Sequence, residues 1–353
     1  SAEPPKAEAV TTTKGVVACV SPAAAEVGAS ILRDGGNAVD AAIAVGFAQA
    51  VTWPEAGNIG GGGFMLVWPG GGKEPVVIDY RETAPLAARA DLFVQDANPL
   101  TLNAAGVPGT VRGMALAHQK FGSRPLTDLV LPAVRLAENG FTVTPGLARS
   151  LNRVLSSDRT TNAELRRCYG KPGGGPWQAG DTLILPDLGR TLRMIAEQGP
   201  DAFYVGKIAE MLATEMKTGN GLITMADLKN YQAKLRAPIR GQYRGYEILT
   251  VAPPSGGGIV LVETLNILEN FPRAEHPRTD PRSVHMVAEA LRRAYADRAR
   301  YLGDPDFTSI PKKLTQKDYA RELAATIRTD RATPSATVAP EIPLADSGGE
   351  TTH

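Results

Sequence analysis

The chain has 353 residues, of which 43% are hydrophobic and 21% are charged, a composition typical of a globular protein with a large core. Its 38 basic and 37 acidic side chains give a formal charge of +1, so no strong net field draws it to nucleic acid or to an anionic membrane. Lysines and arginines are scattered, and no apolar run reaches the ~18 residues that a transmembrane helix needs. We therefore expect no nucleic-acid partner and no membrane partner.

The two cysteines and four histidines form no pattern typical of a disulfide framework or a metal site. Cys19 lies in an apolar run and is interpreted as a small core residue, whereas Cys168 lies in a polar stretch. No spacing argument favours a disulfide between them, and the histidines form no HxxxH or HExxH motif. We therefore expect no dedicated metal site.

The N-terminal residues 1–13 are polar and rich in proline, which predicts a mobile segment. The sequence opens on Ser1 without an apolar leader, as a mature or trimmed N-terminus does. The apolar run that ends the stretch 14–20 then predicts a buried strand.

A helical hairpin is predicted next from its capping residues. Ser21-Pro22 supplies an N-cap and a proline at the first helical position, so a helix over 23–33 follows. Gly35-Gly36 ends this helix, and Asn37 can cap a second helix over 38–51. Small residues on the helix faces suit close packing of the pair.

Two strands follow a run of glycines. The glycine-rich stretch 57–63 enters an apolar strand at 64–68, and a turn with consecutive glycines leads to a second strand at 75–80. We expect these two strands to pair with each other. A glycine run at the entry to a strand also predicts that the backbone passes close to another part of the molecule.

Arg81 lies just past the end of the second strand and is a candidate binding residue. A guanidinium in this position can hold a carboxylate through two parallel hydrogen bonds. The alternative interpretation is an ion pair with Asp79 or Glu82, and the pattern alone favours that alternative.

The rest of the chain alternates helices with short strands. The pattern is mostly helical from about 106 to 221, and a strand is predicted at 245–251 from its β-branched content. Helices are predicted at 259–269 and 283–302. The stretch 330–350 is rich in Pro, Thr, Ser and Ala, which predicts an extended, exposed segment.

Neither glycine-rich turn fits a nucleotide-binding loop. The glycines at 60–63 precede a strand, and those at 256–258 precede a helix but lack the lysine of a phosphate-binding loop. Packing turns are the better interpretation, with a substrate-pocket wall of small residues as a further one. The chain also lacks a GxSxG motif, so a Ser-His-Asp hydrolase is not favoured.

Several long motifs follow one another in a fixed order. They are ILRDGGNAVDAA (31–42), NIGGGGF (58–64), DYRETAP (79–85), VPGTV (107–111), GLIT (221–224), AYADR (294–298), YLGDPDF (301–307) and TTH (351–353). Together they resemble the γ-glutamyltranspeptidase family over nearly the whole chain, from about residue 15 to 353. The terminal TTH is typical of a tail when taken alone, and it acquires a role only through the motifs that precede it.

The resemblance implies an N-terminal-nucleophile hydrolase of the α+β class, with stacked αββα layers. Such a protein is made as one precursor that cuts itself before a threonine, here between Glu350 and Thr351. Residues 1–350 would then be the large subunit and 351–353 the start of the small subunit. The resemblance also implies that Thr351 is the nucleophile and that Arg81 binds the α-carboxylate of the γ-glutamyl group.

The chemistry that this implies needs no metal and no cofactor. A threonine hydroxyl is a weak nucleophile without a base beside it, and cleavage before Thr351 would free an α-amine with a pKa of roughly 7.7–8. That amine can take the hydroxyl proton while the oxygen attacks the γ-amide of glutathione or a related γ-glutamyl compound. Water, an amino acid or a dipeptide then accepts the γ-glutamyl group from the resulting ester.

One motif departs from the family pattern, because PPSGGG stands at 253–258 where the family commonly has PPSSGG. The family's oxyanion-hole donors and most of its contacts to the glutamyl α-amine lie in the small subunit. The resemblance therefore implies that the chain works with a small subunit of the same precursor.

Two alternatives stay open. A related acylase, of the glutaryl-cephalosporin or poly-γ-glutamate type, would keep the fold and change the acyl group. A member that cannot process itself would only bind γ-glutamyl ligands or act as a scaffold. Bacterial members of the family are often exported, so we expect a periplasmic or secreted protein whose signal peptide has been removed.

Overall fold

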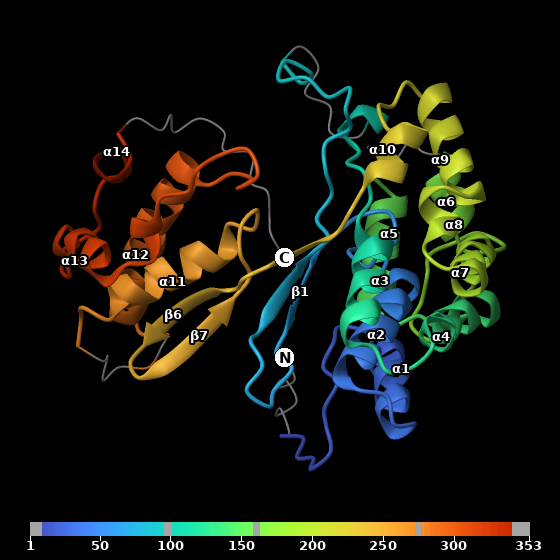
Figure 1. The fold of residues 1–353 in the computed structure, drawn as a ribbon, viewed down its shortest axis with the longest axis horizontal. Helices are drawn as coiled ribbons and strands as arrows, with labels where there is room; N and C mark the ends of the chain where they lie inside the picture. The colour runs from blue at the N-terminus through green and yellow to red at the C-terminus, as the bar shows by residue number, and fades with distance from the viewer. Residues whose placement is uncertain (1–8, 95–100, 158–162, 273–276, 278, 341–353) are drawn as a thin grey trace. The chain divides into compact units, whose positions relative to one another are not determined.

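The computed structural model describes residues 9–94, 101–157, 163–272, 277 and 279–340 (Figure 1). Its internal contacts divide the chain into two compact units. The first unit comprises Ser1–Gly63 and Ile78–Lys234, and the second comprises Phe64–Val77 and Leu235–His353. No helix in the part of the chain that the structure describes is both long enough and apolar enough to span a bilayer.

The first unit opens with the predicted helical hairpin, α1 (Pro22–Arg33) and α2 (Ala38–Thr52). Ser21 caps α1 by accepting the Ala24 N–H at 3.3 Å. Asn37 and Asp40 form a reciprocal capping box at the start of α2. The hairpin and both caps predicted from the sequence are therefore confirmed.

Helix α2 lies at the centre of the first unit and packs against both α1 and α4. It is apolar on all sides, and Ile43, Phe47 and Val51 are at most 1% exposed. The remaining helices confirm the helical pattern expected between 106 and 221. They are α3 (Thr110–Phe121), α4 (Leu126–Asn139), α5 (Pro145–Leu155), α6 (Ala163–Tyr169), α7 (Pro186–Gln198), α8 (Asp201–Tyr204), α9 (Lys207–Thr218) and α10 (Met225–Asn230), with the 3-10 turn η1 (Leu102–Ala104). A short antiparallel pair, β3 (Phe141–Thr142) and β4 (Thr182–Leu183), joins distant parts of this unit.

Strands β1 (Phe64–Val67), β2 (Val76–Asp79) and β5 (Lys234–Arg236) form a three-stranded sheet in the order β1-β2-β5. The predicted pairing of the first two strands is confirmed. The chain passes between the two units at 63–64, 77–78 and 234–235, so each crossing lies within or beside one of these strands.

The second unit contains an antiparallel hairpin and a group of helices. The hairpin pairs β6 (Ile239–Tyr243) with β7 (Tyr246–Thr250), and Gly241 lies opposite Ile248. The helices are α11 (Gly257–Leu268), α12 (Pro281–Tyr301), α13 (Lys317–Ala325) and α14 (Ser335–Val338), with the 3-10 turn η2 (Lys312–Thr315). The strand at 245–251 and both helices predicted in this region are confirmed.

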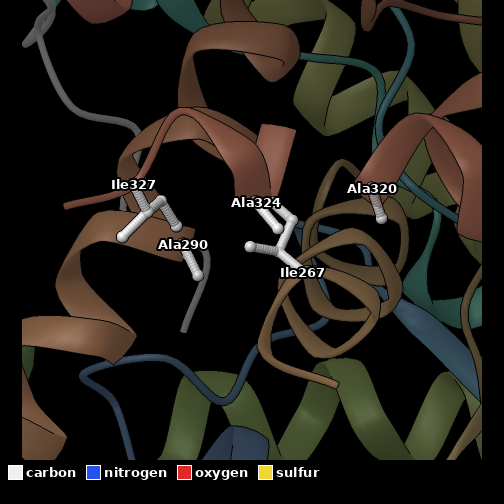
Figure 2. Close-up of a cluster of buried hydrophobic side chains, with 5 residues drawn as sticks. All are labelled: Ile267, Ala290, Ala320, Ala324 and Ile327. Carbon is white, nitrogen blue, oxygen red and sulfur yellow. The ribbon is translucent and has the colours of Figure 1, made fainter. Parts of the chain in front are cut away.

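Figure 2 shows a small apolar core in the second unit. It contains Ile267 of α11, Ala290 of α12, Ala320 and Ala324 of α13, and Ile327 just beyond α13, all at most 8% exposed. Three of the five side chains are methyl groups, so the backbones of these helices can approach closely.

Three local predictions were wrong. The stretch 14–20 forms no strand, and Val16 and Val20 are 67% and 62% exposed. A strand needs a hydrogen-bonding neighbour, and an apolar run does not supply one. Cys19 is consequently half-buried rather than a core residue, and both cysteines are free thiols. The stretch expected to be extended from 330 onward includes the single helical turn α14, and its part from 341 onward lies outside the described residues.

A buried ion pair on α12 ties this helix to the segment that leads into α14. Glu289 and Arg293 are 2% and 4% exposed and lie 2.7 Å apart. The Glu289 carboxylate also accepts the backbone N–H of Thr333 at 3.1 Å and its hydroxyl at 2.7 Å. Burial alone would raise the pKa of Glu289, but the hydrogen bonds from Arg293 and Thr333 hold it down at about 2.

Replacing Arg293 with Ala should destabilise the complete protein by about 3–5 kcal/mol, because the Glu289 carboxylate would stay buried without its main partner. Arg292 is the matched control, since it pairs with the same carboxylate at 2.6 Å but is 30% exposed. Its replacement by Ala should cost about 1 kcal/mol or less. Urea unfolding of the two variants measures both effects, and equal losses would contradict the special role of the buried partner.

Candidate active site

Arg81 lies directly after β2, at the point where the chain leaves the sheet. Just before it, Tyr80 exchanges two backbone hydrogen bonds with Gly63, at 3.0 and 3.3 Å. The Arg81 N–H donates to Oδ1 of Asp79 at 3.1 Å, and its carbonyl accepts the hydroxyl of Tyr231 at 2.8 Å. Both polar groups of the Arg81 backbone are therefore bonded, and the residue remains partly exposed.

Glycines surround this backbone because no side chain would fit. A Cβ on Gly62 would lie 2.5 Å from the Tyr80 carbonyl oxygen and 2.9 Å from the Arg81 Cα. A Cβ on Gly109 would lie 1.9 Å from the same carbonyl oxygen. Gly113 is as restricted, since its Cβ would lie 2.1 Å from the Tyr80 ring. The close backbone approach predicted from the glycine run is confirmed, and its partner is the segment that carries Arg81.

The glycine-rich loop is joined to the start of α3 by a compact hydrogen-bond network. Oδ1 of Asn58 accepts the Gly61 N–H at 2.9 Å and the Thr110 hydroxyl at 2.7 Å. The carbonyl of Gly61 accepts the N–H groups of Gly109 and Thr110 at 2.7 and 3.0 Å. The motifs at 58–64 and 107–111 are therefore parts of one hydrogen-bonded structure.

Tyr231, which bonds the Arg81 carbonyl, stacks on a second tyrosine, Tyr204. The rings of Tyr204 and Tyr231 are nearly parallel, at 13°, with their centroids 5.9 Å apart. The Tyr204 hydroxyl donates to the Pro108 carbonyl at 2.9 Å and accepts the Arg112 N–H at 3.1 Å. Burial raises the pKa of both phenols well above the ordinary value, so both remain neutral donors.

The structure thus brings three of the sequence motifs together around Arg81, those at 58–64, 79–85 and 107–111. The motif at 221–224 is linked to this segment less directly, because Thr224 bonds Asp227, whose other carboxylate oxygen accepts the Leu86 N–H. Tyr204, Asp227 and Tyr231 were not recognised from the sequence. The Thr224-x-x-Asp227 spacing is a helix-start signal that could have placed α10, but no local pattern indicates that Tyr231 contacts Arg81. Glu350 and Thr351 lie outside the described residues.

The PPSGGG motif lies in the second unit and leads into α11. Its Ser255 is buried, and a Cβ on Gly258 would lie 2.1 Å from the carbonyl oxygen of Val251. Close packing therefore accounts for this glycine, in agreement with the interpretation of the loop as a packing turn.

One group of possible metal ligands occurs among the described residues. Oxygen or sulfur atoms of Glu164, Cys168 and Asp187 lie within 4.8 Å of one another. The guanidinium of Arg167, however, donates to Glu164 at 2.8 Å and to Asp187 at 2.5 Å. A cation already neutralises these carboxylates, so the geometry assigns no metal here.

Comparison with known proteins agrees with the motifs. A family model described as gamma-glutamyltranspeptidase matches residues 24–353. The chain belongs to the γ-glutamyltranspeptidase family. The glutathione hydrolase proenzyme of Escherichia coli strain K12 is 46% identical over 348 residues, which cover 96% of this chain and 60% of the relative. The acylase ACY 1 proenzyme of Pseudomonas sp. strain V22 is 40% identical over 342 residues, which cover 91% of this chain and 60% of the relative.

The fold agrees with solved members of the γ-glutamyltranspeptidase family. The crystal structure of Helicobacter pylori γ-glutamyltranspeptidase matches with a TM-score of 0.89 and 39% identity, over 97% of this chain and 99% of that one. The expected α+β fold class of the N-terminal-nucleophile hydrolases is thereby confirmed. The chain spans about 60% of the length of the curated relatives it matches.

Proposed function

We propose that this chain is the large-subunit part of a γ-glutamyl hydrolase/transpeptidase that acts on glutathione and related γ-glutamyl compounds. The observation that carries the proposal is the packing of two further family motifs, at 58–64 and 107–111, against the backbone of the motif that contains Arg81. This arginine follows a strand end, and glycines and tyrosines fix its main chain. A guanidinium on so rigid a support is suited to bind the α-carboxylate of a γ-glutamyl group.

The reaction itself would begin at Thr351. Cleavage of the Glu350–Thr351 bond would leave Thr351 with a free α-amine, which takes the proton of the Thr351 hydroxyl. The hydroxyl oxygen attacks the γ-amide carbonyl, the amine of the substrate leaves with a proton, and a γ-glutamyl ester remains. Water or the amine of an amino acid or dipeptide then breaks the ester and restores the threonine hydroxyl.

The partner in this proposal is the small subunit of the same precursor. The name proenzyme, given to the relatives in Escherichia coli and Bacillus subtilis, supports processing of one precursor. We also propose a periplasmic or secreted location, which rests on the export of bacterial family members.

The rates at which the enzyme cleaves two amide substrates test which acyl group it prefers. The complete processed enzyme should turn over γ-glutamyl-p-nitroanilide faster than glutaryl-p-nitroanilide, which lacks the α-amine. The acylase alternative is supported by the 40% identical acylase ACY 1 proenzyme and predicts the reverse preference. Cleavage of the glutaryl amide alone would reject the proposal in favour of the acylase.

Replacing Arg81 with Ala in the complete enzyme should raise KM for γ-glutamyl-p-nitroanilide at least roughly tenfold, since a charged hydrogen bond contributes about 1.5–3 kcal/mol. KM for 4-aminobutanoyl-p-nitroanilide, which lacks the α-carboxylate, should stay nearly unchanged. Arg89→Ala is the control, because Arg89 is exposed and pairs with Asp91 at 3.3 Å. Equal losses on both substrates would show that Arg81 makes a structural ion pair instead.

A further inference from the structure

We propose that α10 and the residue that follows it, Tyr231, set the orientation of Arg81, and that Tyr231 is a positioning residue for recognition of the substrate carboxylate. This inference rests on the proposed role of Arg81. It concerns a part of the chain that lies 150 residues away in sequence and that bonds to the backbone carbonyl of Arg81.

Helix α10 contacts the segment 81–86 at both of its ends. At one end the Tyr231 hydroxyl donates to the Arg81 carbonyl at 2.8 Å. At the other end Oδ1 of Asp227 accepts the Leu86 N–H at 2.7 Å. Tyr231 and Asp227 are only 5% and 6% exposed, so water competes little for either bond. The segment that begins with Arg81 is thus held against a single short helix.

The Asp227 carboxylate divides its two oxygens between the helix and the segment. Oδ2 accepts the Thr224 N–H at 2.8 Å and the Thr224 hydroxyl at 2.6 Å, which completes the capping box of α10. Oδ1 is therefore left to accept the Leu86 N–H. Burial alone would raise the pKa of Asp227, but these hydrogen bonds keep it below its ordinary value, so the carboxylate is charged at neutral pH. The start of α10 and the end of the segment 81–86 are therefore both held by the Asp227 carboxylate.

Tyr231 itself has little freedom to move. Its ring stacks on Tyr204, which is fully buried and is bonded through its hydroxyl to the backbone at Pro108 and Arg112. The backbone of Gly109 lies against the Tyr231 hydroxyl, since a Cβ there would come within 2.2 Å of the hydroxyl oxygen. The donor that fixes the Arg81 carbonyl is therefore itself held by close neighbours.

This support matters for binding because a two-bond contact between guanidinium and carboxylate requires a defined direction of approach. Beyond Asp79 the chain has left β2, so the sheet no longer sets the backbone of Arg81. The bonds at its N–H and carbonyl fix the peptide planes on either side, and these determine where the Cα–Cβ bond points. A misplacement of about 1 Å in such a contact is enough to weaken binding strongly.

The test compares Tyr231→Phe with the wild type in the complete processed enzyme, using γ-glutamyl-p-nitroanilide and 4-aminobutanoyl-p-nitroanilide. Loss of this hydrogen bond should raise KM for the γ-glutamyl substrate roughly two- to twelvefold with kcat nearly unchanged, and should lower the melting temperature slightly because the buried carbonyl loses its donor. KM for the substrate without the carboxylate should not change. Tyr246→Phe is the matched control, since Tyr246 is 74% exposed in the second unit.

A second variant acts at the other end of the segment. Leu86 is 79% exposed and occupies the second position of a turn closed by the Ala88 N–H and the Pro85 carbonyl at 2.9 Å. Proline suits this turn position, and Leu86→Pro both removes the N–H donated to Asp227 and places the ring Cδ against that carboxylate, so it breaks the contact between the segment and α10. It should raise KM for the γ-glutamyl substrate in the same selective manner as Tyr231→Phe.

The outcomes separate this inference from the proposed function. If Arg81→Ala discriminates between the two substrates and both Tyr231→Phe and Leu86→Pro leave KM unchanged, the positioning role is overturned while the proposed function stands. If the Tyr231 variant loses stability and turnover equally on both substrates, Tyr231 is a structural residue and the inference also fails. If Arg81→Ala itself shows no discrimination, the role proposed for Arg81 is wrong.

Discussion

Replacing Thr351 with Ala should leave the complete proenzyme as one uncut polypeptide with no detectable turnover of γ-glutamyl amides. The substitution removes the hydroxyl that would attack the Glu350 carbonyl during maturation. Without the cut, no free α-amine forms at position 351, so the base is absent as well as the nucleophile. Intact mass after long incubation measures the first loss, and a γ-glutamyl-p-nitroanilide assay measures the second.

The adjacent threonine provides a matched control for this experiment. Thr352→Ala removes an identical hydroxyl one residue later and should still allow the cut before Thr351. Thr351→Ser keeps a hydroxyl at the proposed position and should also be processed. A Thr351→Ala protein that splits at the same bond would contradict the proposed self-cleavage, and a wild-type proenzyme that never splits would favour the inactive alternative.

Features set by near neighbours in the sequence were predictable. The caps at Ser21 and Asn37 satisfy N–H groups within three residues, so their side chains alone indicate where α1 and α2 begin. The position of Arg81 past a strand end was equally local. By contrast, no local pattern indicated that the stretch 14–20 lacks a strand partner, and the prediction there was wrong.

The environment of Arg81 could be predicted only in part. The glycine run at 57–63 indicated a close approach, but the partner of Gly62 is the main chain of Tyr80 and Arg81, which only the fold identifies. Tyr231 contacts Arg81 across 150 residues, and nothing in its own neighbourhood marks it as a hydrogen-bond donor to that backbone. Long-range contacts of this kind depend on the topology of the whole unit rather than on residue spacing.

A buried acid in the second unit leads to the remaining prediction. Glu263 of α11 is 1% exposed, and within the described part of the chain no donor reaches either of its carboxylate oxygens. Burial, followed by the neighbouring carboxylate of Asp297, raises the pKa of Glu263 to about 9. Asp297 is itself bonded, since it accepts the Tyr319 hydroxyl at 2.6 Å and pairs with Arg300 at 3.3 Å. Glu263 is therefore protonated at neutral pH, and its proton can bridge to Asp297.

This protonation makes stability depend on pH in a direction opposite to that of a carboxylate whose pKa is lowered by ion pairs and hydrogen bonds, such as Glu289. Because the pKa of Glu263 is about 9 in the folded chain and 4.5 for a glutamate side chain in water, the folded state holds a proton between these values that the unfolded state has lost. The contribution is fully present below about pH 4.5 and declines on the order of 1 kcal/mol for each pH unit up to about pH 9. The pKa of Glu289 is about 2 in the folded chain, so its stabilising contribution is complete once the pH has risen to about 4.5. That contribution is constant at higher pH and does not offset the loss of stability that comes from Glu263.

Glu263→Gln should remove this decline, because an amide fills the same space, donates a hydrogen bond to Asp297 and does not titrate. Urea midpoints of the Thr351→Ala proenzyme from pH 5 to 9 measure the effect in a single polypeptide, without dissociation of subunits. Relative to its parent, the Gln variant should gain stability steadily as the pH rises, whereas Glu322→Gln on the exposed surface of α13 should follow the parent. Parallel profiles for the parent and Glu263→Gln would show that Glu263 is charged in the folded chain, and a buried pair of charged carboxylates would then require a cation that compensates both.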